Sequence, residues 1–115
     1  MMQRGDIFWV NEVNGTGSEY RGTRPGIIVS NDAANKVCPV VQVVLLTSNT
    51  KRLDLPVRVP VYSSGVLSTA CCEQICAVDK QRIGTYIGHC TPLEMHEIDK
   101  AMMVSLGLQE VEHGR

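Results

Sequence analysis

Short apolar runs, separated by polar residues and glycines, cover most of this chain up to about residue 90. The runs at 26–30 and 40–46 are apolar at nearly every position, which is typical of central strands buried on both faces. The run at 56–61 alternates and holds two prolines, which predicts an edge strand because proline cannot donate to a strand ladder. Altogether the pattern predicts six short strands, at 6–10, 26–30, 40–46, 56–61, 68–77 and 85–89.

Polar segments connect these strands. Residues 10–15 begin a long loop that ends at Pro25, and 31–36 is rich in Asn and Asp, which predicts a turn. The remaining connections are predicted as polar loops or turns at 47–52, 63–65 and 78–83.

The hydrophobic period changes after residue 90. Thr91 and Glu94 have the spacing of a capping box, with proline at the first helical position, and Gly107 is a natural stop. Apolar residues then recur at helical spacing, which predicts one amphipathic helix over 92–106 packed on the sheet. The fold class predicted is mainly β with a C-terminal α-helix, curled into a small barrel and forming a single domain over residues 1–115. The expected apolar face consists of Leu93, Met95, Ile98, Ala101, Met102 and Leu106.

Composition narrows the functional class. The chain has 115 residues, 43% of them hydrophobic and 20% charged, with neither an apolar run long enough to span a membrane nor the apolar core of a signal peptide. We therefore expect a cytoplasmic protein. The net charge is −1, but residues 1–93 carry nine Lys and Arg against seven Asp and Glu, while 94–115 carry two against five. A basic surface can exist locally in the first part.

Five cysteines are present, an odd number that does not suit a secreted disulfide framework. Reduced structural thiols are the expected state, with a redox or metal role as the alternative. The spacing contains no C-x-x-C pair. We expect neither a metal site nor another cofactor.

The loop that precedes the second predicted strand holds the most chemistry. Three glycines, Gly17, Gly22 and Gly26, accompany a carboxylate, a phenol and two guanidiniums between residues 17 and 26. Pro25 fixes its own φ and restrains Arg24, which immediately precedes it. This arrangement suits the presentation of a forked, charged donor to a phosphate.

Seven segments match one known family in the order in which that family has them: 5–10, 17–19, 24–25, 29–32, 46–48, 73–75 and 103–108. On these segments the chain resembles the MazF/PemK (Kid) toxins of type II toxin–antitoxin systems. The resemblance implies an SH3-like barrel that forms a homodimer. It also implies a sequence-specific, metal-independent endoribonuclease that cleaves single-stranded RNA (mRNA) by attack of the ribose 2′-OH, giving a 2′,3′-cyclic phosphate and a 5′-OH. A cognate antitoxin that fills the RNA groove would neutralise it.

The resemblance also assigns roles to residues. Arg24 and Thr47 match the catalytic pair, and Glu19 matches a glutamate that would be an auxiliary base or a substrate contact. Tyr20 and Gln74 are candidate base contacts. The residues expected to contact phosphates are Arg21, Arg24, Lys51, Arg52 and Arg58. The predicted substrate-binding residues are Ser18, Tyr20, Arg21, Lys51, Arg52, Glu73 and Gln74.

Structural alternatives stay open for these residues. Arg24 could pair with Asp32, Thr47 could simply end a strand, and the pair Glu73–Gln74 could be an outward polar pair. Phe8 and Trp9 are expected in the core rather than as a base-stacking platform, and His89 and His96 are expected to be structural. Two other functions compete with the nuclease: a gyrase-poisoning toxin of the same general fold, and a regulatory binding module without activity. Retention of Arg24, Thr47 and Glu19 favours the enzyme.

Overall fold

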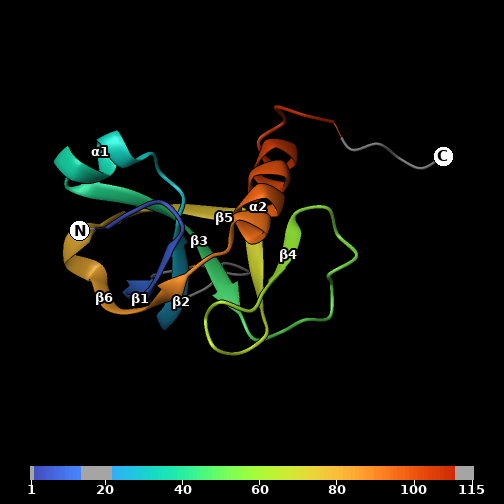
Figure 1. Ribbon diagram of the computed structural model, residues 1–115, viewed down its shortest axis with the longest axis horizontal. Coiled ribbons are helices and arrows are strands. Elements are labelled where there is room, and N and C mark those ends of the chain that lie inside the picture. The colour runs from blue at the N-terminus through green and yellow to red at the C-terminus, as the bar shows by residue number, and fades with distance from the viewer. Residues whose placement is uncertain (1, 14–21, 111–115) are drawn as a thin grey trace.

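The computed structural model describes residues 2–13 and 22–110. These residues form one antiparallel six-stranded sheet in the order β4-β5-β3-β2-β1-β6 (Figure 1). The strands are β1 (Asp6–Val13), β2 (Gly22–Ile28), β3 (Val40–Thr47), β4 (Arg58–Val61), β5 (Ser68–Asp79) and β6 (Ile83–His89). The helices are α1 (Asp32–Val37), the 3₁₀ helix η1 (Lys80–Arg82) and α2 (Pro92–Ser105).

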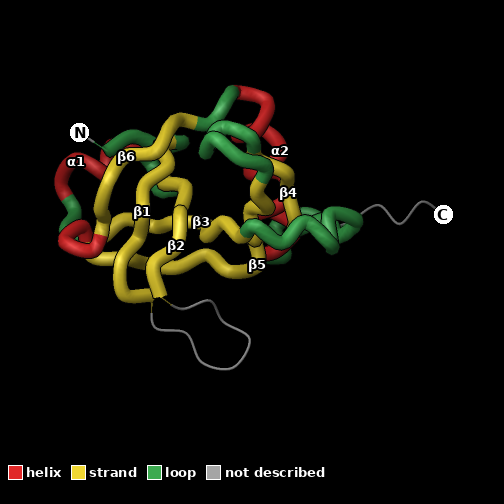
Figure 2. Tube along the Cα trace, turned by 90° about the horizontal axis from the view of Figure 1, so that it is seen from below, coloured by secondary structure: helices red, strands yellow, loops and turns green. Residues whose placement is uncertain are grey.

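The predicted fold class is confirmed: a mainly β structure ends in one C-terminal α-helix. The strands curve round instead of forming a flat layer (Figure 2). The sheet is not closed into a barrel, because in the described part of the chain β4 pairs with β5 alone and β6 with β1 alone. The edge position predicted for the proline-containing strand is correct, since β4 is an edge and Pro60 is exposed.

The predicted ends of the first two strands were wrong. β1 continues through Val13 instead of giving way to a loop, and β2 begins at Gly22. Arg24 and Pro25 therefore lie inside β2 rather than in the loop before it. Val10 pairs with Arg24 and Trp9 with Pro25, whereas β3 pairs with β2 only from Gly26 onward. β2 thus has a free edge at Pro25, which is where a strand tolerates proline.

The segment 31–36 is not a turn. It contains the N-cap and most of α1, in which the Asn31 side chain accepts a hydrogen bond from the Ala34 backbone N–H at 2.8 Å. Asn and Asp favour turns and helix N-caps for the same reason, because their short side chains accept from nearby backbone N–H groups. Pro39 follows directly after the C-cap residue Cys38 and prevents the helix from continuing.

Two apolar clusters lie on opposite faces of the sheet. The first contains Ile7, Ile27, Val44 and Leu46, and α2 covers it with Ile98 and Ala101. The second consists of Val10, Ile28, Val41, Val43, Leu45 and Val78. Successive residues of a strand direct their side chains to opposite faces of the sheet, so alternate positions along one strand contribute to different clusters.

The boundaries of α2 agree closely with the prediction. Thr91 and Glu94 form the capping box, and Gly107, with φ +74°, follows the C-cap residue. The Leu108 N–H donates to the Met103 carbonyl and the Gly107 N–H to the Val104 carbonyl, which is the Schellman pattern. The predicted apolar face was partly wrong, because Leu93 and Leu106 are 70% and 61% exposed.

Trp9 was also placed wrongly. Its side chain is 42% exposed, whereas Phe8 is half-buried against the second cluster and makes an edge-to-face contact with Tyr86. By the alternation of a strand, Trp9 lies on the same face of β1 as Ile7, two residues farther along the strand.

Candidate active site

Arg24 and Thr47 come from two neighbouring strands. Arg24 lies in the first half of β2 and is half-exposed, and Thr47 is the last residue of β3 and is 9% exposed. The Thr47 hydroxyl accepts a hydrogen bond from the Asn49 backbone N–H at 3.3 Å. This contact fixes the start of the loop after β3 to the threonine.

Arg24 and Thr47 each lie two residues beyond the last pair of the β2–β3 ladder, so their relation is inferred from the register. β2 and β3 pair antiparallel, with Gly26 opposite Leu45 and Ile28 opposite Val43. Continuing this register by two residues sets Arg24 opposite Thr47. Both follow the alternation of the second apolar cluster, so their side chains share the face of the sheet that α2 does not cover.

A third polar residue continues this row. Thr69 of β5 pairs with Thr47 across the β3–β5 ladder and has no exposed surface. Arg24, Thr47 and Thr69 therefore form one row across β2, β3 and β5, called here the Arg–Thr–Thr row. Sequence reasoning missed Thr69. Thr69 is found only from the pairing of β3 with β5. The register of this pairing shifts between Val44 and Leu46, and no local sequence pattern predicts such a shift.

The remaining predicted loop residues cannot be placed. Ser18, Glu19, Tyr20 and Arg21 lie outside the described residues. Their predicted roles stay predictions.

Two of the predicted phosphate contacts are already in ion pairs. Arg52 Nε lies 3.1 Å from Asp54 Oδ1, and this contact lowers the pKa of the aspartate. Arg58 Nε donates to the Glu73 carboxylate at 2.8 Å. Lys51 is exposed in the same loop as Arg52, and its backbone N–H donates to Asn49 Oδ1 at 2.9 Å. Positive charge near the row is therefore smaller than a count of basic residues suggests.

The predicted substrate residues of β5 differ in their surroundings. Glu73 is exposed but is paired with Arg58, so its carboxylate orders the edge of the sheet. Gln74 is half-buried.

The proposed pairing of Arg24 with Asp32 has a competitor, because Asp32 accepts hydrogen bonds from the Arg4 backbone N–H and the Asn35 amide. These contacts, the backbone N–H first, lower the pKa of Asp32.

All five cysteines are free thiols. Burial raises the pKa of Cys72 and of Cys90 to about 12, so these two stay protonated near neutral pH. Residues 2–13 and 22–110 contain no group of three or more His, Cys, Asp or Glu side chains arranged to hold a metal ion. Nor does this part of the chain contain a helix long and apolar enough to cross a membrane.

Comparison with known proteins identifies the family. The model of the PemK-like, MazF-like toxins of type II toxin–antitoxin systems matches residues 3–106. The chain belongs to this PemK/MazF family. The Endoribonuclease MazF of Staphylococcus epidermidis is 32% identical over 117 residues, a match that covers 98% of each chain.

Solved structures of PemK/MazF toxins have the same fold. A mycobacterial endoribonuclease, solved in complex with its cognate antitoxin, superposes with a TM-score of 0.79 at 28% identity, covering 96% of this chain and all of that one. MazF from Deinococcus radiodurans has a TM-score of 0.80 at 23% identity, covering 92% and 96% of the two chains, and supports the fold alone.

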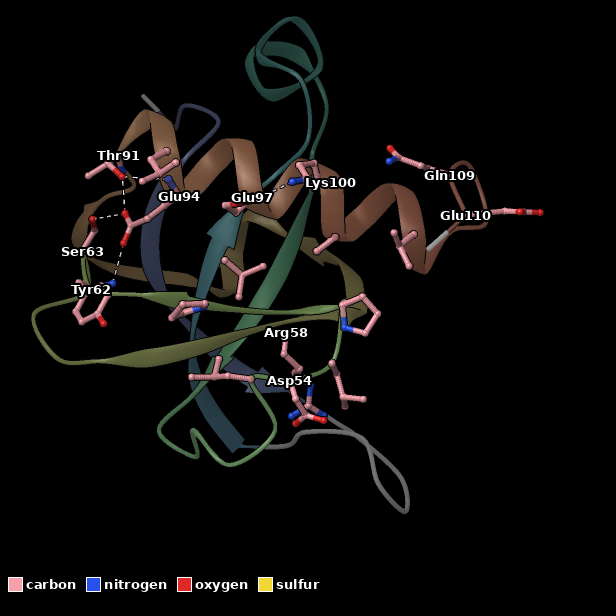
Figure 3. Close-up of a pocket in the computed structure, with 18 residues that line it drawn as sticks. Asp54, Arg58, Tyr62, Ser63, Thr91, Glu94, Glu97, Lys100, Gln109 and Glu110 are labelled. Carbon is pink, nitrogen blue, oxygen red and sulfur yellow. Dashed lines mark hydrogen bonds and ion pairs between the residues drawn. The ribbon is translucent and has the colours of Figure 1, made fainter. Parts of the chain in front are cut away.

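This PemK/MazF chain also has a groove of about 1210 Å³, separate from the Arg–Thr–Thr row. It runs between α2 and the segment 53–63, and none of the three row residues lines it (Figure 3). At one end, Glu94 Oε2 accepts from the Tyr62 N–H at 2.7 Å, and Glu94 Oε1 accepts from the Thr91 N–H at 2.8 Å. The Ser63 hydroxyl donates to the same carboxylate. This end of the groove is a structural joint between α2 and β4.

Proposed function

We propose that this protein is a sequence-specific endoribonuclease toxin that cleaves single-stranded RNA and is neutralised by a cognate antitoxin. One observation supports the proposal: in a chain of the PemK/MazF family, the β2–β3 register, extended by two residues, puts Arg24 opposite Thr47 on the face of the sheet that α2 does not cover. A gyrase binder or an inactive module has no requirement for that pair.

The proposed reaction uses the ribose 2′-OH as the nucleophile. Attack on the adjacent phosphorus forms a bond to the 2′ oxygen and breaks the bond to the 5′ oxygen. The 2′-OH loses one proton and the leaving oxygen gains one, which gives a 2′,3′-cyclic phosphate and a 5′-OH. Arg24 holds two phosphate oxygens with its fork of N–H donors, and Thr47 donates its hydroxyl to the same phosphate. A guanidinium is very hard to deprotonate, so Glu19 is the better base for the 2′-OH proton.

We propose that this chemistry needs no metal ion. The nucleophile is part of the substrate, so no water has to be activated, and Arg24 supplies the positive charge that the phosphorane requires. Bases in a single strand can be splayed and read by their edges, which a duplex prevents. Gln74 and Tyr20 are the proposed base contacts, and Lys51 is a phosphate contact.

In this proposal the protein acts in the cytoplasm as a homodimer, and each chain forms a single domain. Leu106 and Leu108 are 61% and 74% exposed at the end of α2, and covering them would remove apolar surface from water. A twofold arrangement is the commonest way for identical chains to do so. The antitoxin proposal is supported by the mycobacterial relative, which was solved with its own antitoxin.

The test is cleavage of a long RNA by the purified chain in EDTA, with mapping of cut sites and end groups. We expect cuts at one short shared motif, with 2′,3′-cyclic phosphate ends, and resistance of the same sequence as a duplex. Loss of cleavage on chelation, with recovery in Mg²⁺, would refute metal independence. Scattered cuts without a shared motif would refute sequence specificity.

A further inference from the structure

The Thr69 hydroxyl is buried without a hydrogen bond. Within the described residues, its Oγ1 has no partner, and the residue is 0% exposed. A buried hydroxyl without a partner destabilises a fold, because it loses its bonds to water and gains none. Valine would fill nearly the same space without this cost. The threonine therefore points to a use for its hydroxyl.

Position in the sheet indicates what that use is. Thr69 pairs directly with Thr47, and paired residues on antiparallel strands direct their side chains to the same face, with Cβ atoms about 4.5–5.5 Å apart. Its complete burial keeps Thr69 away from any RNA, whereas Thr47 borders the half-exposed Arg24 by register. Thr69 pairs with Pro60 of β4 on one side and with Thr47 on the other, and only Thr47 is a proposed catalytic residue, so the direct route from Thr69 to a substrate runs through Thr47.

We infer that Thr69 is a positioning residue, whose hydroxyl donates to Thr47 Oγ1 and thereby directs the Thr47 proton toward the phosphate. This rests on the proposed nuclease function and extends it. A threonine hydroxyl has one proton to donate and two lone pairs. The Asn49 N–H occupies one lone pair at 3.3 Å. Donation from Thr69 occupies the other, and the single Thr47 proton is left to point outward.

Two further effects favour this arrangement. Rotation about χ1 moves a threonine hydroxyl between staggered positions, so the cross-strand bond can form without backbone movement. A hydroxyl that accepts a hydrogen bond also becomes a stronger donor, because chained hydrogen bonds polarise one another. No proton is transferred between the two threonines. The effect of Thr69 is orientation and polarisation alone.

The test compares Thr69→Val, which keeps the shape, with Thr69→Ser, which keeps the hydroxyl. The readout is the single-turnover cleavage rate on a single-stranded RNA that contains the mapped site. Thr69→Val should slow cleavage about tenfold, the effect of losing one hydrogen bond in the transition state. Affinity for the same RNA with a 2′-deoxy ribose at the cut should not change. Thr69→Ser should stay within about twofold of the natural chain.

A Thr47→Val background shows whether the effect passes through Thr47. There, Thr69→Val should cause no additional loss of rate. An equal loss in both backgrounds, an unchanged rate in Thr69→Val, or failure of serine to restore it would overturn the inference. Loss of one hydrogen bond should lower the thermal midpoint of Thr69→Val by no more than about 4–8 °C, and a slow variant is then not simply an unfolded one.

Failure of the proposed function gives a different result. If the natural chain leaves every RNA intact, the nuclease proposal fails. The threonine pair is then judged by thermal midpoints of Thr47→Val, Thr69→Val and the double variant. Non-additive shifts support a hydrogen bond between the two hydroxyls, and additive shifts refute it.

Discussion

Replacing Glu94 by glutamine tests how the start of α2 is joined to the sheet. The Glu94 carboxylate is buried and accepts three hydrogen bonds, from the Tyr62 N–H, the Ser63 hydroxyl and the Thr91 N–H (Figure 3). One of these closes the capping box, and the other two connect α2 to the turn after β4. A glutamine has the same shape but a single acceptor oxygen, and its amide group would face donors.

The expected loss follows from these contacts. Hydrogen bonds to a charged group contribute about 1.5–3 kcal/mol each, and a buried donor left without its acceptor costs about 1–3 kcal/mol. Glutamine keeps part of this set, so Glu94→Gln should lower the free energy of unfolding by about 2–4 kcal/mol. Against a total of roughly 5–15 kcal/mol for a typical domain, the variant should still fold.

The loss should depend on pH. Burial alone would raise the pKa of Glu94, but the hydrogen bonds from Ser63, Thr91 and Tyr62 outweigh it and lower the pKa. A carboxyl whose pKa falls on folding stabilises the protein fully above its unfolded pKa of about 4.3, and this contribution is lost as pH falls through the folded pKa. The difference between the natural chain and Glu94→Gln should therefore shrink in acid.

Urea unfolding at fixed protein concentration measures both effects. The matched control is Glu97→Gln on the same helix, whose carboxylate pairs with Lys100 at 3.4 Å on the surface and should contribute no more than about 0.5 kcal/mol. A Glu94→Gln loss no larger than that of the control would refute the joint. So would a difference that stays constant between about pH 7 and about pH 3.5.

The remaining predictions concern activity and assembly. Arg24→Ala should slow RNA cleavage by about 10²–10³, and Arg24→Lys should recover little because lysine has no planar fork; full activity of Arg24→Lys would show that the arginine is structural. Lys51→Ala should reduce the salt dependence of RNA binding by about 0.7 in the log–log slope, with unchanged cut sites, and an unaltered slope would remove Lys51 from the phosphate contacts. Sedimentation at micromolar concentration should show a dimer that Leu108→Glu weakens, and a monomeric natural chain would contradict the assembly proposal.

Local sequence patterns were sufficient for the elements with strong signals. β3 is a valine-rich apolar run of strand length, and α2 is bounded by a capping box and a glycine with positive φ. α1 was missed because six residues are too few to show a helical period, and Asn31 suits a turn as well as an N-cap. Barrel closure depends on whether the two edge strands meet, which no local pattern encodes.

The candidate site was less predictable than the fold. Arg24 and Thr47 were identified through the family resemblance, and their proximity follows from a register that the sequence does not display. Charge counting treated Arg52 and Arg58 as available cations, whereas Asp54 and Glu73 pair with them. Such pairs depend on which strands become neighbours, so composition alone overestimates the free positive charge.

The helix-covered face of the sheet holds contacts that stabilise the fold, and the opposite face holds the proposed catalytic residues. α2 covers the first apolar cluster, and the Glu94 joint lies on that side. Arg24 and Thr47 follow the alternation of the second cluster, on the opposite face. Because the Glu94 contacts include none of the row residues, and sites without shared partners usually contribute independently, Glu94 variants should change unfolding without altering the intrinsic cleavage rate, and Arg24 variants should do the reverse. A double variant at Glu94 and Arg24 should therefore show additive effects in both measurements, and strong coupling would mean that the helix-covered face also shapes the row.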